Sequence, residues 1–286
     1  MIVIKAKLID LHTHSTCSDG SMTPTELVRH AAENSLAAIA MTDHDTVSGV
    51  EEALRAGERY GIEVVPAIEF SVKSETETHI LGFFIDIHNP VLQGILSEII
   101  EKRIERNAMT AKLLQNLGFD VTLEEAKSLA PGGVVGRAHF ARVMMNKGFV
   151  SSVKEAFEKY LASGKPAYFG NQKLEAKTAI EAIHSAGGVA FLAHPHLIKI
   201  PDERLEKFLD ELKTFGLDGL EGYYTDYDEE MQAKFQAMAE RHGLGISGGT
   251  DFHAQMKPHI AIGKGLGNMA IPYSVLEKIK ESVSKK

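Results

Sequence analysis

Short apolar runs alternate with amphipathic helical patterns along most of the chain. Apolar runs of about four to eight residues between polar segments predict buried strands, whereas apolar residues that recur with helical periodicity predict helices. Strands are expected at residues 3–12, 37–44, 62–70, 78–85, 189–195, 219–224 and 245–253. Helical patterns separate most of them, and one helix start carries a capping box of Thr23 and Glu26 around Pro24. Strands that alternate with helices predict an α/β fold with a parallel sheet or a barrel.

This alternation stops between about residues 91 and 169, where the pattern is mostly helical. Residues 95–118 predict one long amphipathic helix, and two shorter helices are expected after it. The alternation of strands and helices then resumes. We therefore expect a barrel domain built from residues 1–98 and 170–286, interrupted by a small helical domain at residues 99–169 that binds substrate.

Composition narrows the class of protein. Of the 286 residues, 44% are hydrophobic and 24% are charged, which is typical of a globular protein with a sizeable core. The formal net charge of −8 and the absence of tryptophan argue against a nucleic-acid-binding module, but they are compatible with a small phosphorylated substrate or a short single-stranded RNA. Cys17 is the only cysteine, so no disulfide forms within the chain. The sequence carries no signal-peptide pattern and no apolar run of membrane-spanning length, so we expect a cytoplasmic protein without a membrane partner.

Polar side chains collect where the expected strands end. In α/β barrels the carboxyl ends of the strands form one face, and the active site is built there. Besides Asp43, which ends the second strand together with His44, the polar groups at these ends, in the following loops or at the start of a strand are the nine ligand candidates His12, His14, Asp19, His44, Glu69, His79, His194, Asp251 and His253. Distant parts of the chain are therefore expected to contribute to one polar face.

The pair of histidines at residues 12 and 14 indicates a metal site. Side chains at i and i+2 of a strand point to the same side, so both imidazoles can reach one ion. A lone HxH is a weak signal, but the same placement recurs in TDHD, AIEF, LAHP and GTDFH. Imidazoles and carboxylates without a thiolate cluster suit manganese, iron or zinc. Nine such groups predict two or three ions with one bridging carboxylate, an arrangement that activates water and shields the oxygens of a phosphoryl group.

These motifs resemble those of the polymerase-and-histidinol-phosphatase (PHP) family of metal phosphoesterases. The resemblance covers residues 5–90 and 170–260, and it includes HTHSTCSDG, TDHD, PAIEFS with Glu69, His79, AHP and GTDFH in family order. It implies a distorted seven-stranded (β/α) barrel with two to three divalent metal ions. Manganese is the metal we expect, with iron or zinc as alternatives.

The resemblance also implies how the ligands divide among three ions. The implied sets are His12, His14, Glu69 and Asp251 for the first ion, Glu69, His79 and His194 for the second, and Asp19, His44 and His253 for the third. Glu69 is then a bridging ligand with a direct part in catalysis. Asp251, next to the attacking water, is the candidate for moving its proton.

The helical insert carries a second resemblance. Its segments GVVGRAHFARVM and YLASGKPAYF are similar to those of the subgroup that acts on nucleoside 3′,5′-bisphosphates, whose relatives trim short RNAs from the 5′ end. The resemblance implies that Arg137 and His139 contact a phosphate at the mouth of the site, and the planar fork of arginine suits this contact. Lys165 is a third candidate for substrate binding. Arg103 and Arg106, on the long helix, are expected on a solvated face.

The expected function is metal-assisted hydrolysis of a phosphomonoester. The target would be the 3′-phosphate of a nucleoside 3′,5′-bisphosphate, with short 5′-phosphorylated oligonucleotides as further substrates. Histidinol phosphate or another small phosphate ester is an alternative substrate, and amide or lactone hydrolysis on a related barrel is an alternative reaction. A non-catalytic barrel whose metals stabilise a scaffold is the alternative of a different class. The complete set of nine ligand types favours an enzyme.

Overall fold

The computed structural model describes residues 7–130, 135–170 and 173–285. Residues 3–6 of the first expected strand, and Gly133 and Val134 of the insert motif, lie outside the described residues. None of the described helices combines the length and the apolar character that crossing a membrane requires.

The chain divides into two compact units. Unit 1 consists of Met1–Ile95 and Leu174–Lys286, and unit 2 consists of Leu96–Lys173. These boundaries lie within a few residues of the domain boundaries expected from the sequence. Each unit has its own hydrophobic core.

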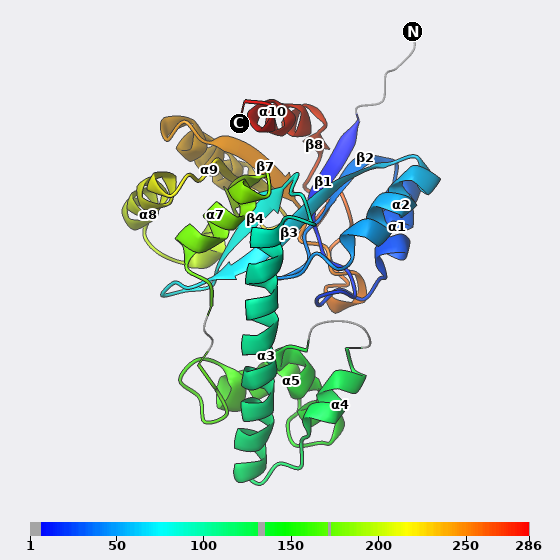
Figure 1. The fold of residues 1–286 in the computed structure, drawn as a ribbon, viewed down its shortest axis with the longest axis vertical. Coiled ribbons are helices and arrows are strands. Elements are labelled where there is room, and N and C mark those ends of the chain that lie inside the picture. Colours follow the sequence, from blue (N-terminus) through cyan, green and yellow to red (C-terminus); the bar gives the residue numbers. More distant parts are fainter. Residues whose placement is uncertain (1–6, 131–134, 171–172, 286) are drawn as a thin grey trace. The chain divides into compact units, whose positions relative to one another are not determined.

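Unit 1 is an eight-stranded sheet with helices packed on it (Figure 1). The strands are β1 (Leu8–Thr13), β2 (Leu36–Met41), β3 (Glu63–Val72), β4 (Thr78–Phe83), β5 (Val189–Leu192), β6 (Gly219–Tyr224), β7 (Gly245–Gly249) and β8 (Ile271–Pro272). The α-helices are α1 (Pro24–Glu33), α2 (Val50–Tyr60), α7 (Ala176–Ser185), α8 (Asp202–Thr214), α9 (Glu229–Arg241) and α10 (Ser274–Val283). Two short 3₁₀-helices follow β5 and β7, namely η2 (Pro195–Ile198) and η3 (Ala254–Met256).

The sheet curls into a nearly closed barrel. Its strand order is β7-β6-β5-β4-β3-β2-β1-β8, and β1, β2 and β3 run parallel to one another, as do β5, β6 and β7. The chain after β7 returns to β1, where the backbone N–H of His14 donates to the carbonyl of Phe252 at 2.9 Å and Thr13 pairs with Phe252 in parallel. The expected α/β barrel is therefore confirmed. The two-residue strand β8, antiparallel to β1, is an addition that its short sequence did not indicate.

Strand β4 runs opposite to the strands on either side of it. It pairs antiparallel with β3 and with β5, and Ser71 of β3 faces His79 of β4. The amino-terminal end of β4 therefore lies at the edge where the parallel strands have their carboxyl ends. This reversal explains why His79 opens its strand whereas the other polar residues follow theirs.

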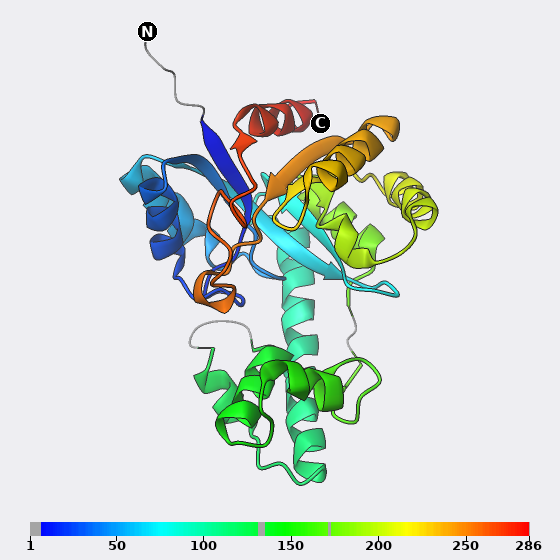
Figure 2. The ribbon, with the colours of Figure 1, turned by 180° about the vertical axis from the view of Figure 1, so that it is seen from behind.

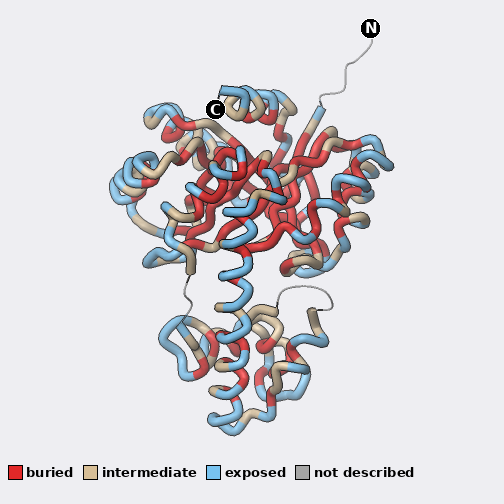
Figure 3. The backbone as a smooth tube through the Cα atoms, viewed as in Figure 1, coloured by how far each residue is buried: buried red, intermediate tan, exposed pale blue. Residues whose placement is uncertain are grey.

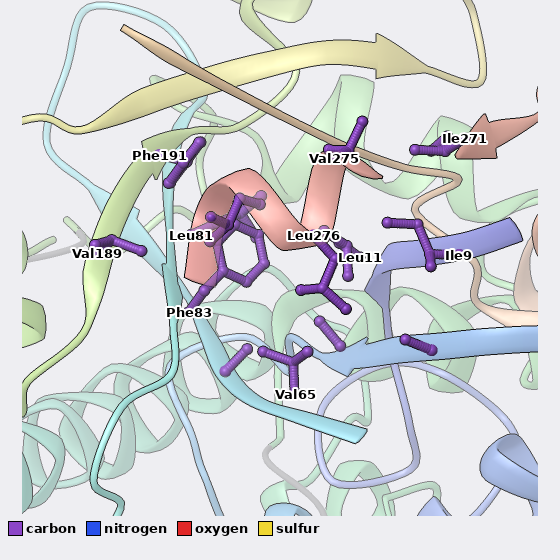
Figure 4. Close-up of a cluster of buried hydrophobic side chains, with 14 of the residues drawn as sticks. Ile9, Leu11, Val65, Leu81, Phe83, Val189, Phe191, Ile271, Val275 and Leu276 are labelled. Carbon is purple, nitrogen blue, oxygen red and sulfur yellow. The ribbon is translucent and has the colours of Figure 1, made fainter. Parts of the chain in front are cut away.

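The core of unit 1 fills the barrel and the space beneath α10. Figure 4 shows Phe83 and Phe191 side by side, with Leu276 of α10 and Leu11 of β1 close to them, and the two phenyl rings meet edge to face with 5.4 Å between their centroids. A Cβ atom at Gly219 would overlap the ring of Phe191, so this glycine makes room for it. The strands are buried along most of their length, whereas the outward faces of the helices are exposed (Figure 3).

In both views of the fold α1 and α2 lie side by side (Figure 2).

Unit 2 is helical, as expected. It holds most of α3 (Pro90–Asn116), then α4 (Leu123–Ser128), α5 (Arg137–Asn146), α6 (Val153–Ala156) and the π-helix η1 (Phe157–Leu161). The helix α3 begins five residues before the expected start at residue 95, because Asn89 caps it by accepting hydrogen bonds from the backbone N–H groups of Val91 and Leu92.

The expectation for Arg106 is wrong. Its side chain is buried rather than solvated, and its guanidinium donates to the amide oxygen of Asn107 at 3.0 Å and to the carbonyl of Val135 at 3.1 Å. Asn107 donates to the same carbonyl at 2.9 Å. Both side chains therefore tie α3 to the segment that leads into α5.

Candidate metal centre

All nine ligand candidates belong to overlapping clusters of donor atoms in unit 1. The clusters, each with its donor atoms within 4.8 Å of one another, are His14–Asp19–His44–His253, His12–His14–Asp251, His12–Glu69–His194 and His44–Glu69–His79. Seven of the nine residues are buried, and Asp19 and His44 are partly exposed. The fold thus brings together the side chains that the sequence singled out.

Glu69 lies at the middle of these clusters, and its carboxylate is fully buried. Its Oε1 is 2.9 Å from Nδ1 of His79 and 3.1 Å from Nε2 of His194. Its Oε2 lies 3.0 to 3.3 Å from one nitrogen of each of three further histidines, His12, His14 and His44. The two oxygens therefore face two separate sets of histidines, which is the geometry that a bridging carboxylate needs.

Asp251 and Asp19 face the remaining side of the cluster. Oδ1 of Asp251 is 3.2 Å from Nε2 of His14 and 3.4 Å from Nδ1 of His253. Oδ1 of Asp19 is 3.1 Å from Nε2 of His253, and its Oδ2 is 3.9 Å from Nε2 of His44. Most close contacts in the cluster pair an imidazole nitrogen with a carboxylate oxygen, and one joins two imidazoles, with Nδ1 of His79 3.2 Å from Nε2 of His194.

Whether metal ions fit this cluster can be judged from the buried donor atoms that lack a hydrogen-bond partner. Among the described residues, the buried site atoms that lack a hydrogen-bond partner are Nε2 of His12, both ring nitrogens of His14, Nδ1 of His44, Oε2 of Glu69 and Nδ1 of His194. Leaving a buried polar atom unsatisfied costs about 1–3 kcal/mol. Divalent cations would satisfy several of these atoms at once, so the donor set fits metal ions.

The protonation states of His14 and of the central carboxylates suit cation binding, whereas at His12 and His253 the surrounding carboxylates outweigh the effect of burial and raise the pKa, so a cation has to displace a proton from these two rings. Burial lowers the pKa of His14 to about 3, with the nearby His253 acting in the same direction, so this imidazole is neutral and has a free lone pair on one ring nitrogen. Burial by itself would raise the pKa of Glu69, but the surrounding histidines, His44 and His12 foremost, hold it well below its usual value. Asp251 is held well below its usual pKa in the same way, chiefly by His12. Neutral imidazole and ionised carboxylate are the forms that bind metals.

Glu221 is a functional residue that the sequence reasoning missed. It lies on β6, is fully buried, and its Oε1 is 2.9 Å from Nδ1 of His12. Its Oε2 accepts a hydrogen bond from the backbone N–H of His194 at 2.6 Å. A carboxylate behind a ligating histidine fixes the orientation of the ring, so Glu221 directs Nε2 of His12 toward the cluster. The only signal in the sequence was an acidic residue inside the otherwise uncharged strand GLEGYY.

Two more buried carboxylates hold the loops of the site. Asp10 accepts hydrogen bonds from the backbone N–H and the hydroxyl of Thr250 and from the backbone N–H of Gly263. Asp43 accepts from the backbone N–H and the hydroxyl of Ser15 and from the hydroxyl of Ser18. These contacts fix the loops that carry His14 and Asp251.

Backbone conformation also marks two of the ligand candidates. His194 has φ of 27° and Asp251 has φ of 55°, so both lie in the left-handed region that residues with a Cβ rarely adopt. Such residues cost roughly 1–3 kcal/mol each and cluster at functional sites. Next to Asp251, Gly249 lies so close to His12 that a Cβ atom there would overlap the His12 backbone nitrogen.

The expected phosphate-binding residues lie in unit 2. Arg137 and His139 are in the first turn of α5, and both are partly exposed. Nη1 of Arg137 donates to the carbonyl of Leu161 at 3.2 Å, and its guanidinium carbon lies 5.2 Å from the centre of the Tyr168 ring. Nδ1 of His139 accepts a hydrogen bond from the backbone N–H of Gly136 at 2.9 Å. Lys165 is exposed in the turn after η1.

A nearly closed α/β barrel with this cluster of imidazoles and carboxylates fits a metal-dependent hydrolase, and comparison with known proteins identifies the class as a metal-dependent phosphoesterase, a phosphoric ester hydrolase. The PHP domain profile matches residues 10–219. The chain belongs to the PHP domain family.

Two curated relatives extend this similarity over nearly the whole chain. The 5′-3′ exoribonuclease Rnm of Escherichia coli is 36% identical over 264 residues, which cover 91% of this chain and 90% of the relative. The 3′,5′-nucleoside bisphosphate phosphatase of Chromobacterium violaceum is also 36% identical, over 248 residues that cover 86% of this chain and 87% of the relative.

Solved structures show the same fold. A structure from Chromobacterium violaceum described as an amidohydrolase, with bound sulfate and no metal, superposes with a TM-score of 0.84 at 33% identity, and the match covers 96% of both chains. A structure from Bifidobacterium adolescentis, assigned as a metal-dependent phosphoesterase, has a TM-score of 0.82 at 26% identity, again over 96% of both chains. The resemblance seen in the motifs is therefore confirmed for the whole fold.

Proposed function

We propose that this protein removes the 3′-phosphate of nucleoside 3′,5′-bisphosphates. The observation that carries the proposal is the 36% identity to a 3′,5′-nucleoside bisphosphate phosphatase over 248 residues. That alignment is longer than unit 1, so it extends into unit 2, where Arg137 and His139 lie. A histidinol phosphatase would not be expected to share the helical insert, unit 2, with a nucleoside bisphosphate phosphatase. The compartment we propose is the cytoplasm.

The nine clustered side chains are proposed to hold two to three divalent ions, manganese foremost, with iron or zinc as alternatives. When bound, such ions lower the pKa of water and neutralise phosphoryl oxygens. We assign Glu69 the bridging position because its two oxygens face different histidines. Asp251 contributes Oδ1, the oxygen that faces His14. We retain Asp251 as the candidate for receiving the proton of the attacking water.

The residues of α5 are proposed to hold the 5′-phosphate of the substrate. The contact of Arg137 with Leu161 uses one of the five guanidinium N–H groups, and the fork geometry of arginine suits phosphate oxygens. Because Nδ1 of His139 accepts a hydrogen bond, the proton of the neutral ring sits on Nε2, which makes that nitrogen a donor. The positive end of the α5 dipole also favours an anion. Lys165, exposed in the turn after η1, is the third residue proposed to contact the substrate.

A second candidate activity is the removal of nucleotides from the 5′ end of short RNAs. It is favoured by the relatives from Escherichia coli and Haemophilus influenzae, both named as 5′-3′ exoribonucleases and both 36% identical. A short oligonucleotide shares with the bisphosphate a 5′-phosphate and a phosphoryl group on O3′. The same site could therefore act on both.

A phosphate-release assay with manganese-loaded protein tests the proposal. The substrates are adenosine 3′,5′-bisphosphate, adenosine 3′-phosphate, adenosine 5′-phosphate and histidinol phosphate, together with a 5′-phosphorylated trinucleotide followed by chromatography. We expect the bisphosphate to have the highest kcat/KM among the monoesters and to yield the 5′-phosphate. A higher kcat/KM for histidinol phosphate, or equal values for all four monoesters, would contradict the proposal.

A further inference from the structure

Lys257 contacts the candidate metal centre without being one of its nine ligand candidates. Its Nζ donates to Oδ2 of Asp251 at 2.6 Å. The hydroxyl of Tyr224 donates to the same oxygen at 2.8 Å. The other oxygen of Asp251, Oδ1, is 3.2 Å from Nε2 of His14. A single carboxylate group therefore separates the lysine ammonium from the histidine cluster.

Of the two described side chains that donate to Oδ2 of Asp251, Lys257 is the one accessible to a substrate. Tyr224 is 3% exposed, whereas 35% of the Lys257 side chain is exposed. An ammonium group has three N–H donors, and the contact with Asp251 uses one of them. The four-carbon stem of lysine also lets the charge move by a few ångströms. Lys257 therefore has the position, the donors and the reach to contact a molecule bound at the cluster.

Hydrolysis of a nucleoside 3′-phosphate requires charge stabilisation on the side of the leaving group. When the P–O3′ bond breaks, its electron pair stays on O3′, and a ribose alkoxide is a poor leaving group. In the proposed centre the nine ligand candidates hold the ions and face the attacking water and the phosphoryl group, which leaves the leaving-group side to other residues. We propose that Lys257 donates an N–H hydrogen bond to the departing O3′ and stabilises its negative charge in the transition state. This inference rests on the proposed phosphomonoesterase function.

The step balances without a further reactant. The oxygen of a water molecule bonds to phosphorus as the P–O3′ bond breaks. The attacking water loses one proton, for which Asp251 is the proposed acceptor and which then passes to solvent, and O3′ gains one proton from solvent, so the products are the 3′-hydroxyl and inorganic phosphate. Lys257 is unchanged at the end of the step.

The dependence of the rate on the leaving group tests this role. The Lys257→Met variant removes the charge and the donors but keeps the length of the side chain. We compare wild type and variant on adenosine 3′,5′-bisphosphate, phenyl phosphate and p-nitrophenyl phosphate, whose leaving groups need progressively less stabilisation. We expect kcat/KM to fall about 10²-fold for the bisphosphate, less for phenyl phosphate, and only a few-fold for p-nitrophenyl phosphate. The exposed Lys264, replaced by methionine, is the matched control and should leave all three values unchanged.

The outcomes separate this inference from the proposed function. Ratios of kcat/KM between substrates do not depend on the fraction of active protein, so partial misfolding of the variant does not obscure them. If wild type hydrolyses these substrates but the variant loses activity equally on all of them, or loses it completely, Lys257 is a structural partner of Asp251 and the inference is wrong. If wild type hydrolyses none of them, the proposed function itself fails. Elemental analysis of the same variant should show unchanged metal content, and a loss of metal would also count against the inference.

Discussion

Oε1 of Glu221 lies 2.9 Å from Nδ1 of His12, and neither side chain is exposed to solvent. The two residues come from strands β6 and β1, which are separated by most of the sequence. The contact orients the His12 ring so that Nε2 faces Glu69 at 3.3 Å. Because the other oxygen of Glu221 holds the backbone of His194, one carboxylate sets the position of two ligand candidates.

Replacing Glu221 by glutamine should weaken metal binding without removing a ligand. The amide keeps the size of the side chain but loses the charge that polarises His12. Loss of such a partner typically costs 10- to 100-fold in metal affinity or activity. Competition with a fluorescent chelator measures the affinity. Glu63→Gln, a change at the start of β3 where the carboxylate contacts Lys280 and Tyr273, is the control and should bind metal as wild type does.

Replacing Glu69 by glutamine should lower metal content and activity more than replacing any one histidine near Asp19. If Glu69 bridges two ions, the change removes an oxygen ligand from one of them and a charge from both. We therefore expect lower metal content and lower kcat for Glu69→Gln than for His253→Asn, measured by elemental analysis and phosphate release. Turnover close to that of wild type in Glu69→Gln would rule out the bridging role.

Removing metal should abolish activity and lower the melting temperature. Without cations, Nε2 of His12, both ring nitrogens of His14 and Nδ1 of His194 are buried and have no hydrogen-bond partner among the described residues. Binding of ions to the folded state alone stabilises it by mass action. We expect a strong chelator to abolish phosphate release, manganese to restore it, and scanning calorimetry to show a lower Tm for the stripped protein. Protein expressed with added manganese should carry two to three ions per chain, and fewer than one would contradict the proposed centre.

Arg137→Ala should discriminate between substrates. Arg137 is proposed to hold a second phosphate group, which adenosine 3′,5′-bisphosphate has and p-nitrophenyl phosphate lacks. A charge-assisted contact is worth about 1.5–3 kcal/mol, so kcat/KM should fall about 10- to 100-fold for the bisphosphate and little for the other substrate. Arg55→Ala, on an exposed position of α2, serves as the control. An equal loss on both substrates with metal retained would place Arg137 at the reacting phosphoryl group or in the fold.

Gly249→Ala should disturb the closure of the barrel. The added methyl group would overlap His12, whose backbone cannot move without displacing β1. Overpacking a tight site costs about 1–3 kcal/mol, and here it should also reduce metal content because His12 is a proposed ligand. Gly94→Ala, in α3 with open space around it, should be neutral or slightly stabilising. Differential scanning calorimetry compares the two variants, and equal melting temperatures would show that β1 has room for the methyl group.

Local sequence determined the parts of this protein that depend on a few neighbouring residues. The capping box of Thr23 and Glu26 is present as expected, because its two hydrogen bonds form within a single turn. The strands were recognisable from their apolar runs. The side chains that follow them, His14 and His194 among them, could be assigned to one edge because parallel strands share a direction. That rule covers the candidates at or after the carboxyl ends of the parallel strands, but not His79, which opens the antiparallel strand β4.

Tertiary structure decided what depends on which distant segments meet. The sequence does not indicate that β4 reverses its direction, that Arg106 is buried against Val135, or that Glu221 reaches His12. A buried acidic residue looks the same in sequence whether its partner is a neighbour or lies 209 positions away. Such partners meet only when the sheet closes, where the chain after β7 contacts β1 through Phe252 and His14. Hydrogen bonds act over about 3 Å, so they require this closure, and the periodicity of the local sequence does not indicate them.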